Sequence, residues 1–370
     1  MSAGKLSLLT MTVGFIRVPL PRPLKVSTFD LPGVDTCCVT LRTREGLSGV
    51  GWCFAFGAER LRALAAMVRD QFSTLIGKDP RNTEENWAAM RKSVSFVGRD
   101  GVSAHAIGAL DTACWDIKAK AEGVPLWKLL GGERTEISCY ASEGLFLNDS
   151  VDDLQREAEG LLARGHTAMK LRAGKPGLAE DAARARAVRE AIGSGTALMM
   201  DANQGWSVDQ AKAACGALEE FGLEWIEEPV DYEDVRGCAE VAAASNIPVC
   251  QGETSYNPRG MRHLLVAGAA DVLMADLQRM SGVTGWLQAA AIAREYGKPI
   301  TSHLFHEVSA HLMSAVPEAV WCEHMPWWEI ILEEPMEMKN GRLQLTEKPG
   351  LGIEWNDAAI QKFTHPAGGF

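Results

Sequence analysis

The chain has 370 residues, and its 37 Lys and Arg against 48 Asp and Glu give a formal charge of −11. An acidic chain without a run of Lys or Arg repels phosphate backbones, so we expect no nucleic-acid partner. No apolar run approaches the ~20 residues needed to cross a bilayer, so we expect no membrane partner.

The cysteines indicate a reducing compartment. There are nine of them, an odd number, and no pair has the C-x-x-C spacing. Disulfide frameworks belong mainly to small secreted domains, so we expect reduced thiols. The stretch Leu6–Val13 alternates and is too short for a secretory signal, which indicates a strand instead. We therefore expect a cytoplasmic protein.

Residues 1–130 have the pattern of an α+β module. Strand-forming residues fill Met11–Leu20 and Thr36–Leu41. The proline-containing stretch Pro21–Gly33 lies between them, and it is either a lid or an ordinary loop. The period then becomes helical, most clearly over Ser103–Lys120, where apolar residues recur on one face.

Residues 131–324 repeat a short apolar strand followed by a helix. The predicted strands are Ile137–Ser142, Thr167–Leu171, Ala197–Asp201, Leu223–Glu227, Val249–Gln251, Val272–Asp276, Ile300–Ser302 and Val320–Glu323. The clearest intervening helices are Val151–Arg164, Ala179–Ile192, Val208–Phe221 and Thr284–Tyr296. This pattern predicts an α/β fold, a (β/α)8 barrel. A doubly wound sheet is the alternative, but no glycine-rich dinucleotide motif follows any strand.

The remaining residues, 325–370, are of mixed character. A hairpin is predicted near Lys339-Asn-Gly341. We expect this C-terminal segment to pack on the barrel and on the N-terminal module, which would cap the barrel.

Ionisable residues stand at the ends of successive predicted strands, about one β/α unit apart. They are Lys170, Asp201, Glu227, Glu253, Asp276, His303 and Glu323. Ordinary polar residues at loop entries are the alternative explanation. Because catalytic groups of such barrels lie at the carboxyl ends of the strands, we expect these side chains to meet at the barrel mouth.

Three of these residues, Asp201, Glu227 and Glu253, are carboxylates on adjacent strands. If they converge, their mutual repulsion needs a cation. Oxygen-only ligands suit Mg²⁺ and admit Mn²⁺, whereas zinc usually takes Cys or His. The sequence therefore predicts a Mg²⁺ site.

Asp276 and His303 lie one unit apart, which is the arrangement of a general base oriented by a carboxylate. Taken singly, Asp276 could cap a helix and His303 could be a core histidine. Lys170 and Arg172 point the same way from their strand, so two cations are expected to face the pocket. Together these groups predict abstraction of the α-proton of a carboxylate substrate through a metal-stabilised enediolate.

Glu323 is expected to donate a hydrogen bond to the developing oxyanion, provided that it is protonated. On this hypothesis, Glu323→Gln retains much more activity than Glu323→Ala.

The chain resembles the enolase superfamily, mandelate racemase subgroup, over nearly its full length. The matching motifs are Ala106–Asp116 with Lys118, Met200–Trp206, Trp225–Pro229, Gly252-Glu253, Asp276 with Gly282–Trp286, and Ser302–Phe305. The resemblance implies a capping domain, with Val26–Gly33 and Trp52–Phe56 closing the pocket, and a homo-oligomer.

The resemblance also implies residue roles. Asp201, Glu227 and Glu253 would be the Mg²⁺ ligands, Asp276 and His303 the base dyad, and Glu323 the electrophilic acid. Lys170 would contact the substrate carboxylate and Asn203 the substrate.

One position departs from the family pattern, because Arg172 stands where racemases have the second lysine of Lys-x-Lys. Deprotonation at pH 7 costs roughly 4.6 kcal/mol for lysine and at least about 7.5 kcal/mol for arginine. His303 is therefore the favoured single base, and one-base chemistry favours dehydration.

The leading hypothesis is dehydration of an acid sugar to a 2-keto-3-deoxy acid. Arg172, Asn203 and His306 would bind its hydroxyl groups, although Phe54 and Phe56 could line an apolar pocket instead. The alternatives are a racemase or epimerase of a 2-hydroxy acid and, more remotely, a catalytically silent barrel.

Overall fold

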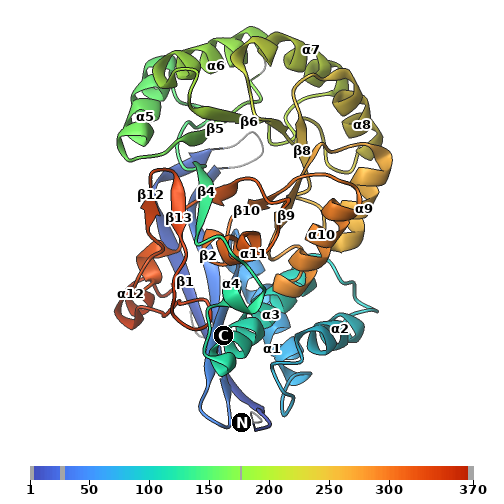
Figure 1. Cartoon of the computed structure of the whole chain (residues 1–370), viewed down its shortest axis with the longest axis vertical. Helices are drawn as coiled ribbons and strands as arrows, with labels where there is room; N and C mark the ends of the chain where they lie inside the picture. Colours follow the sequence, from blue (N-terminus) through green and yellow to red (C-terminus); the bar gives the residue numbers. More distant parts are fainter. Residues whose placement is uncertain (1–3, 26–29, 176, 366–370) are drawn as a thin grey trace.

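The computed structural model describes residues 4–25, 30–175 and 177–365. Figure 1 shows an N-terminal module of strands and helices beneath a ring of β/α units, whose helices form an outer arc. Within the described residues, no helix combines the length and apolar character needed to cross a bilayer.

The N-terminal module is an antiparallel sheet covered by helices. Its strands are β1 (Leu8–Lys25), β2 (Asp30–Thr43) and β3 (Ser48–Ala55), in that order. Its helices are α1 (Ala58–Ser73), α2 (Thr83–Ser93), α3 (Val102–Glu122) and the short α4 (Leu126–Leu129). β3 can approach α3 closely because it carries Gly49 and Gly51. A Cβ at Gly51 would lie 2.1 Å from the carbonyl oxygen of Ala109.

The prediction of a long loop over Pro21–Gly33 is wrong for most of that stretch. β1 and β2 both extend into it, and Leu24 pairs with Leu31 after an irregularity in register that begins at Pro19. The proline ring removes a donor but tolerates extended backbone, so strand pairing resumes beyond the prolines. Residues 26–29, which include part of the predicted closing segment Val26–Gly33, lie outside the described residues.

The predicted barrel is confirmed. Its parallel strands are β4 (Glu136–Ala141), β5 (Ala168–Arg172), β6 (Ala197–Asp201), β7 (Ile226–Glu227), β8 (Val249–Gln251), β9 (Val272–Asp276), β10 (Ile300–His303) and β11 (Cys322–His324). They pair in sequence order from β4 to β10, and β11 pairs with β4. Between β10 and β11, backbone hydrogen bonds join Ile300 to Glu318 and Val320, so the ring is closed.

Helices follow the strands around the outside. They are α5 (Val151–Ala163), α6 (Leu178–Ile192), α7 (Val208–Leu218) with the 3₁₀ turn η1 (Glu219–Phe221), α8 (Val235–Ala244), α9 (Asn257–Ala267), α10 (Val283–Glu295) and α11 (His306–Ser314). Side chains cap the starts of some of these helices. Ser150 accepts a hydrogen bond from the backbone of Asp153, and Ser207 forms a capping box with Gln210.

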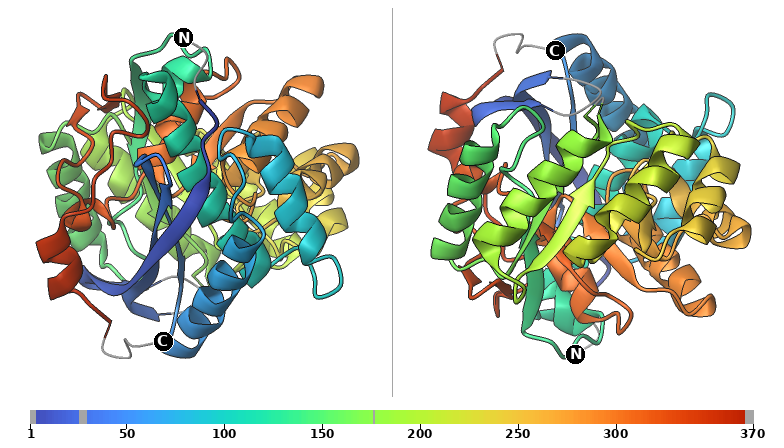
Figure 2. Two further views of the ribbon diagram at one scale, coloured as in Figure 1. Left: turned by 90° about the horizontal axis from the view of Figure 1, so that it is seen from below. Right: turned by 90° about the horizontal axis from the view of Figure 1, so that it is seen from above.

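The C-terminal segment contacts both larger parts. It contains η2 (Glu329–Ile331), β12 (Met338–Lys339), β13 (Arg342–Gln344) and α12 (Asp357–Lys362). The predicted hairpin is β12–β13, and β13 adds to the barrel strand β4 with Leu343 opposite Ile137. The chain after α12 returns to β1, where Arg17 bonds to the carbonyl of Phe363, and Figure 2 shows α12 beside that sheet.

Specific polar contacts dock the capping module on the barrel mouth. Asp111 of α3 accepts hydrogen bonds from the backbone and hydroxyl of Thr284 at 2.8 and 2.7 Å, and Trp115 donates to the same hydroxyl at 2.9 Å. At the end of β3, the backbone of Phe54 donates to Gln278 in the loop after β9. These bonds hold the tip of β3 over the carboxyl ends of the barrel strands.

We predict that Gly51→Ala destabilises the protein by about 1–3 kcal/mol, because the new methyl group overlaps the backbone of α3. Gly14→Ala in β1 is the matched control, since its Cβ would meet nothing closer than 3.8 Å. Urea unfolding monitored by circular dichroism measures both. Equal stabilities of the two variants would contradict the close approach of β3 and α3.

Candidate active site

Three carboxylates meet at the carboxyl ends of adjacent strands. Asp201 ends β6 and is paired with Glu227, which ends β7, while Glu253 follows β8 by two residues. One oxygen from each lies within 4.8 Å of the others. The side chains of Asp201 and Glu227 are fully buried. The strand ends thus form a compact cluster of oxygen donors.

Lys170 and Arg172 of β5 reach into this cluster. The Lys170 amino group lies 2.8 Å from both Glu227 and Glu323 and 3.4 Å from Asp201. Arg172 donates to Asp201. Burial lowers the pKa of Lys170, but the charges of Glu227 and Glu323 outweigh it and hold the pKa above its usual value. Both cations therefore act as counter-ions to the buried carboxylates.

The prediction that both cations face the pocket holds for Arg172 only. Arg172 lines the cavity described below, whereas Lys170 is 1% exposed and points among the carboxylates. The alternation along β5 was predicted correctly. Which neighbours surround Lys170 depends on how strands β6, β7 and β11 curve around it, and that cannot be derived from one strand.

The cluster fits a divalent cation. Burial and the charge of Asp201 raise the pKa of Glu227 well above its ordinary value. The Oε2 atom of Glu253 is buried and makes no hydrogen bond. Converging oxygen donors, one of them without a hydrogen bond, suit Mg²⁺ and admit Mn²⁺.

His303 and Asp276 form the predicted pair on β10 and β9. His303 Nδ1 lies 2.7 Å from Asp276 Oδ2, and Asp276 also accepts a hydrogen bond from the backbone of Arg279. The other ring nitrogen, Nε2, lies 3.6 Å from Glu253 Oε2. Burial lowers the pKa of His303, but the Glu253 charge and the Asp276 bond reverse this and raise it to about 9. The metal-free protein therefore carries a protonated imidazole at neutral pH.

Glu323 does not have the protonated state that the sequence hypothesis required. Its Oε1 accepts from Lys170 and from the hydroxyl of Ser142, and its Oε2 accepts from the backbone of Leu304 at 2.6 Å. Burial raises its pKa, but the charge of Lys170 leaves the pKa well below its usual value. Glu323 is thus an ionised acceptor in this structure, and its role as a hydrogen-bond donor toward a bound substrate stays a prediction.

A cavity of about 810 Å³ lies between the cap and the barrel mouth. From the barrel it is lined by Arg172, Asn203, Glu253, His303 and Glu323, and from the cap by Phe54, Phe56 and His105. Of the segment Trp52–Phe56, Phe54 to Phe56 reach the cavity, whereas Trp52 packs against Phe305 and Trp328. Gly33 lines the cavity as well. Both sides of the lining are mixed: the cap also contributes Arg17, Asp35 and Arg60, and the barrel side also contributes Leu304, Met325 and Trp327.

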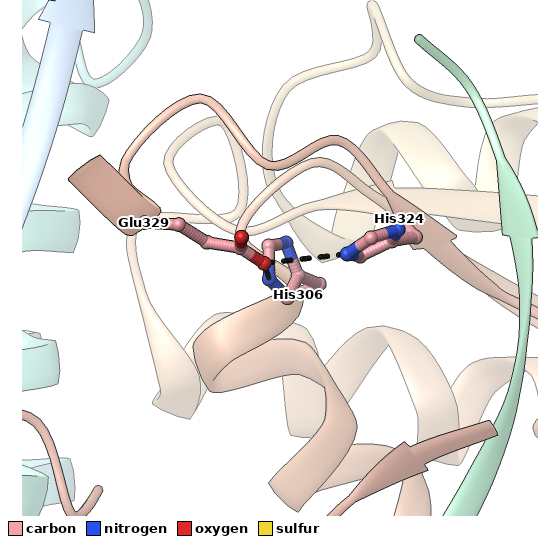
Figure 3. Close-up of side chains that lie close together, drawn as sticks. All are labelled: His306, His324 and Glu329. Carbon is pink, nitrogen blue, oxygen red and sulfur yellow. Dashed lines mark hydrogen bonds and ion pairs between the residues drawn. The ribbon is translucent and has the colours of Figure 1, made fainter. Parts of the chain in front are cut away.

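His306 is not a pocket residue. It is fully buried and lies beside Glu329 and His324, outside the set of described residues that line this cavity (Figure 3). It follows His303 by three residues, but the backbone turns into α11 between them. The backbone at Leu304 and Phe305 has positive φ angles of 50°, which directs the helix away from the mouth.

Similar strained backbone occurs at other strand ends. Asn203, Gln204 and Glu228 also have positive φ angles, of 44°, 63° and 35°. Such conformations cost about 1–3 kcal/mol each and concentrate at functional sites. For Asn203, the turn lets its backbone and side chain bond to Asp201, at 2.8 and 3.1 Å, while the residue still lines the cavity.

Sequence reasoning missed Ser142 and His105. Ser142 directly follows β4 and bridges Glu323 and Arg172, so its place at the carboxyl end of a predicted strand was the available signal. His105 lies on α3 of the cap, stacked with Tyr256. Burial lowers its pKa to about 4. No local pattern marks His105, because it enters the cavity only when the cap docks.

Comparison with known proteins agrees with this architecture. Residues 10–131 match the "Mandelate racemase / muconate lactonizing enzyme, N-terminal domain" model, and residues 153–359 match the "Enolase C-terminal domain-like" model. The chain is 35% identical to L-talarate/galactarate dehydratase of Salmonella typhimurium, over 86% of this chain and 80% of that protein. It is 36% identical to D-galactarolactone cycloisomerase of Agrobacterium fabrum, over 86% and 88%.

Solved structures are also similar. The Salmonella typhimurium dehydratase liganded with Mg and L-lyxarohydroxamate has a TM-score of 0.93 and 31% identity, covering 99% of this chain and 95% of that one. The same fold, the domain matches and the level of identity lead to one conclusion. The chain belongs to the mandelate racemase/muconate lactonizing enzyme family of the enolase superfamily.

Proposed function

We propose that the protein is a Mg²⁺-dependent dehydratase that converts an acid sugar to a 2-keto-3-deoxy acid. The observation that carries this proposal is the His303–Asp276 pair facing a cavity whose opposite polar residue, Arg172, is held as a cation. A single base supports elimination rather than two-base racemisation. The similarity to L-talarate/galactarate dehydratase supports the same substrate class.

Asp201, Glu227 and Glu253 would hold the metal. When bound, Mg²⁺ supplies positive charge that stabilises the negative charge developing on the substrate carboxylate. Arg172 and Asn203 line the same cavity and would bind substrate oxygens. Lys170 and Ser142 both hydrogen-bond to Glu323 and would hold its carboxylate in place beside the substrate.

His303 would remove the α-proton in its neutral form. Electrons from the broken C–H bond form the new C–C double bond, and the β-hydroxyl leaves as its C–O bond breaks. The resulting imidazolium is the group able to protonate this hydroxyl, so water departs and the enol tautomerises to the 2-keto acid. Asp276 orients the ring throughout. The negative charge of Glu253 raises the His303 pKa. If Glu253 bound a metal ion, that charge would be offset and the His303 pKa would move back toward neutrality.

A racemase or epimerase is the second candidate from the sequence. Burial lowers the pKa of Arg172, but the charge of Asp201 outweighs it and raises the pKa above its usual value. This argues against Arg172 as a second base. The similarity to D-galactarolactone cycloisomerase favours a different alternative to dehydration, in which the same base, His303, opens the ring of a sugar-acid lactone. Oligomerisation, a cytoplasmic location and the domain boundaries at 130 and 324 stay predictions.

The function is tested by screening acid sugars with Mg²⁺ in D₂O. We expect a 2-keto product, detected as its semicarbazone, together with a mass loss of one water. His303→Asn should lower the rate at least about 10³-fold, because it removes the base. His263→Asn, on the outer helix α9, is the matched control and should keep the rate. α-Deuterium exchange with inversion and no keto product would refute the dehydratase, and a mass-neutral opening of lactones would identify the cycloisomerase.

The His303 pKa predicts how the stability of chelated, metal-free protein depends on pH. The folded pKa of about 9 exceeds the ordinary 6.5, so His303 contributes stability below about pH 6.5 and loses it as pH rises to 9. The loss is on the order of 3 kcal/mol. Urea unfolding from pH 6 to 9 should show this decline in the wild type and a flatter profile in His303→Asn. Parallel profiles would contradict the assigned pKa shift.

Glu323 generates a prediction opposite to that of the sequence hypothesis. As an acceptor of three hydrogen bonds, it cannot be replaced by glutamine without turning an amide N–H toward Lys170, Ser142 or Leu304. We expect Glu323→Gln to lose about as much kcat as Glu323→Ala. If Glu323→Gln kept at least tenfold more activity than Glu323→Ala, Glu323 would instead act as a hydrogen-bond donor to the substrate oxyanion.

A further inference from the structure

A second cluster of metal-ligating side chains lies behind the active site. It contains His306 at the start of α11, His324 at the end of β11 and Glu329 at the start of η2. One ligand atom from each residue lies within 4.8 Å of the others. Figure 3 shows the Glu329 carboxylate beside the His306 ring, with dashed lines from one of its oxygens to both imidazole rings. The predicted Mg²⁺ ligands contribute nothing to this cluster.

Two distances in the cluster match the edge of a tetrahedral coordination shell. Glu329 Oε1 lies 3.3 Å from His306 Nε2 and 3.3 Å from His324 Nε2. Two ligand atoms that bind one tetrahedral ion at 2.0–2.1 Å are about 3.3–3.4 Å apart. An ordinary N–H···O hydrogen bond is shorter, about 2.9 Å. Glu329 Oε1 therefore lies, from each of the two histidine nitrogens, at the distance that separates two ligands of one tetrahedral ion.

Hydrogen bonds account for only part of this cluster, because His324 Nε2 forms a hydrogen bond with Glu329 Oε1 whereas the ring nitrogens of His306 have no such partner. His306 is fully buried, and neither of its ring nitrogens makes a hydrogen bond of ordinary geometry. Glu307 is also buried, both its oxygens make no hydrogen bond, and its Oε2 lies 3.7 Å from His306 Nδ1. A carboxylate facing the outer nitrogen of a histidine is the usual second layer around a bound metal.

We propose that His306, His324 and Glu329 bind a transition-metal dication of the Zn²⁺ type, separate from the Mg²⁺ site. Two imidazoles and one carboxylate form a donor set that Zn²⁺ and Co²⁺ accept and that Mg²⁺ disfavours. The fourth position is left to water. His324 and Glu329 both line a cavity of about 630 Å³ that supplies the entry path.

The bound ion would tie three elements together near the catalytic pocket. His324 follows Glu323 in β11, and the segment between His324 and Glu329 supplies Met325 and Trp327 to the wall of the active-site cavity. The ion would hold this segment against the start of α11. Its role in this position is structural, because its ligands lie outside the active-site cavity.

The test uses Co²⁺ as the probe, because tetrahedral Co²⁺ absorbs visible light far more strongly than octahedral Co²⁺. Metal-free protein is titrated with Co²⁺ in the presence of excess Mg²⁺. We expect an intense visible band that saturates at one Co²⁺ per chain. The band should disappear in His324→Gln and in Glu329→Gln, whose partly exposed side chains, 12% and 27% exposed, make folded variants accessible.

Two controls locate the ion. Glu253→Gln, in the other carboxylate cluster, should keep the band, and so should His263→Gln on α9. Zn²⁺ should raise the Tm of the wild type but not that of Glu329→Gln, a readout independent of activity. Absence of the band in the wild type, or an equal band in His324→Gln, would overturn the proposal and leave His306 and His324 as polar neighbours of Glu329 without a metal ion.

Discussion

The main constraint on the barrel mouth is the repulsion among the carboxylates at the ends of β6, β7, β8 and β11, which the fold must offset. Asp201, Glu227 and Glu323 are each nearly inaccessible to solvent, so water cannot screen their charges. On the neighbouring β5, Lys170 lies within ion-pair distance of all three, and Arg172 pairs with Asp201. Ser142, which bonds to Glu323 and Arg172, and Asn203, which bonds to Asp201, are held by the same charged groups.

The cap completes the site because it is docked by directional bonds. The α3 carboxylate of Asp111 and the indole of Trp115 both bond to Thr284, and Phe54 bonds to Gln278. These contacts place Phe54 and Phe56 in the same cavity lining as Arg172, Asn203 and His303 of the barrel.

Periodicity and strand-end spacing predicted the barrel and the convergence of Asp201, Glu227, Glu253, Asp276 and His303, because those features follow from local geometry repeated along the chain. They could not predict the ionisation of Glu323, which depends on Lys170 two strands away in space. Nor could they predict that His306 points away from the pocket, since positive φ angles at Leu304 and Phe305 redirect the chain. Long-range packing decides these details.

Lys170 has a consequence beyond catalysis. Its amino group bonds to Glu227 and lies near Asp201, two of the proposed metal ligands, so the protein carries an internal counter-ion for them. Lys170 thus offsets part of the repulsion between these carboxylates when no metal ion is bound. A metal ion entering the site would compete with Lys170 for the same oxygens.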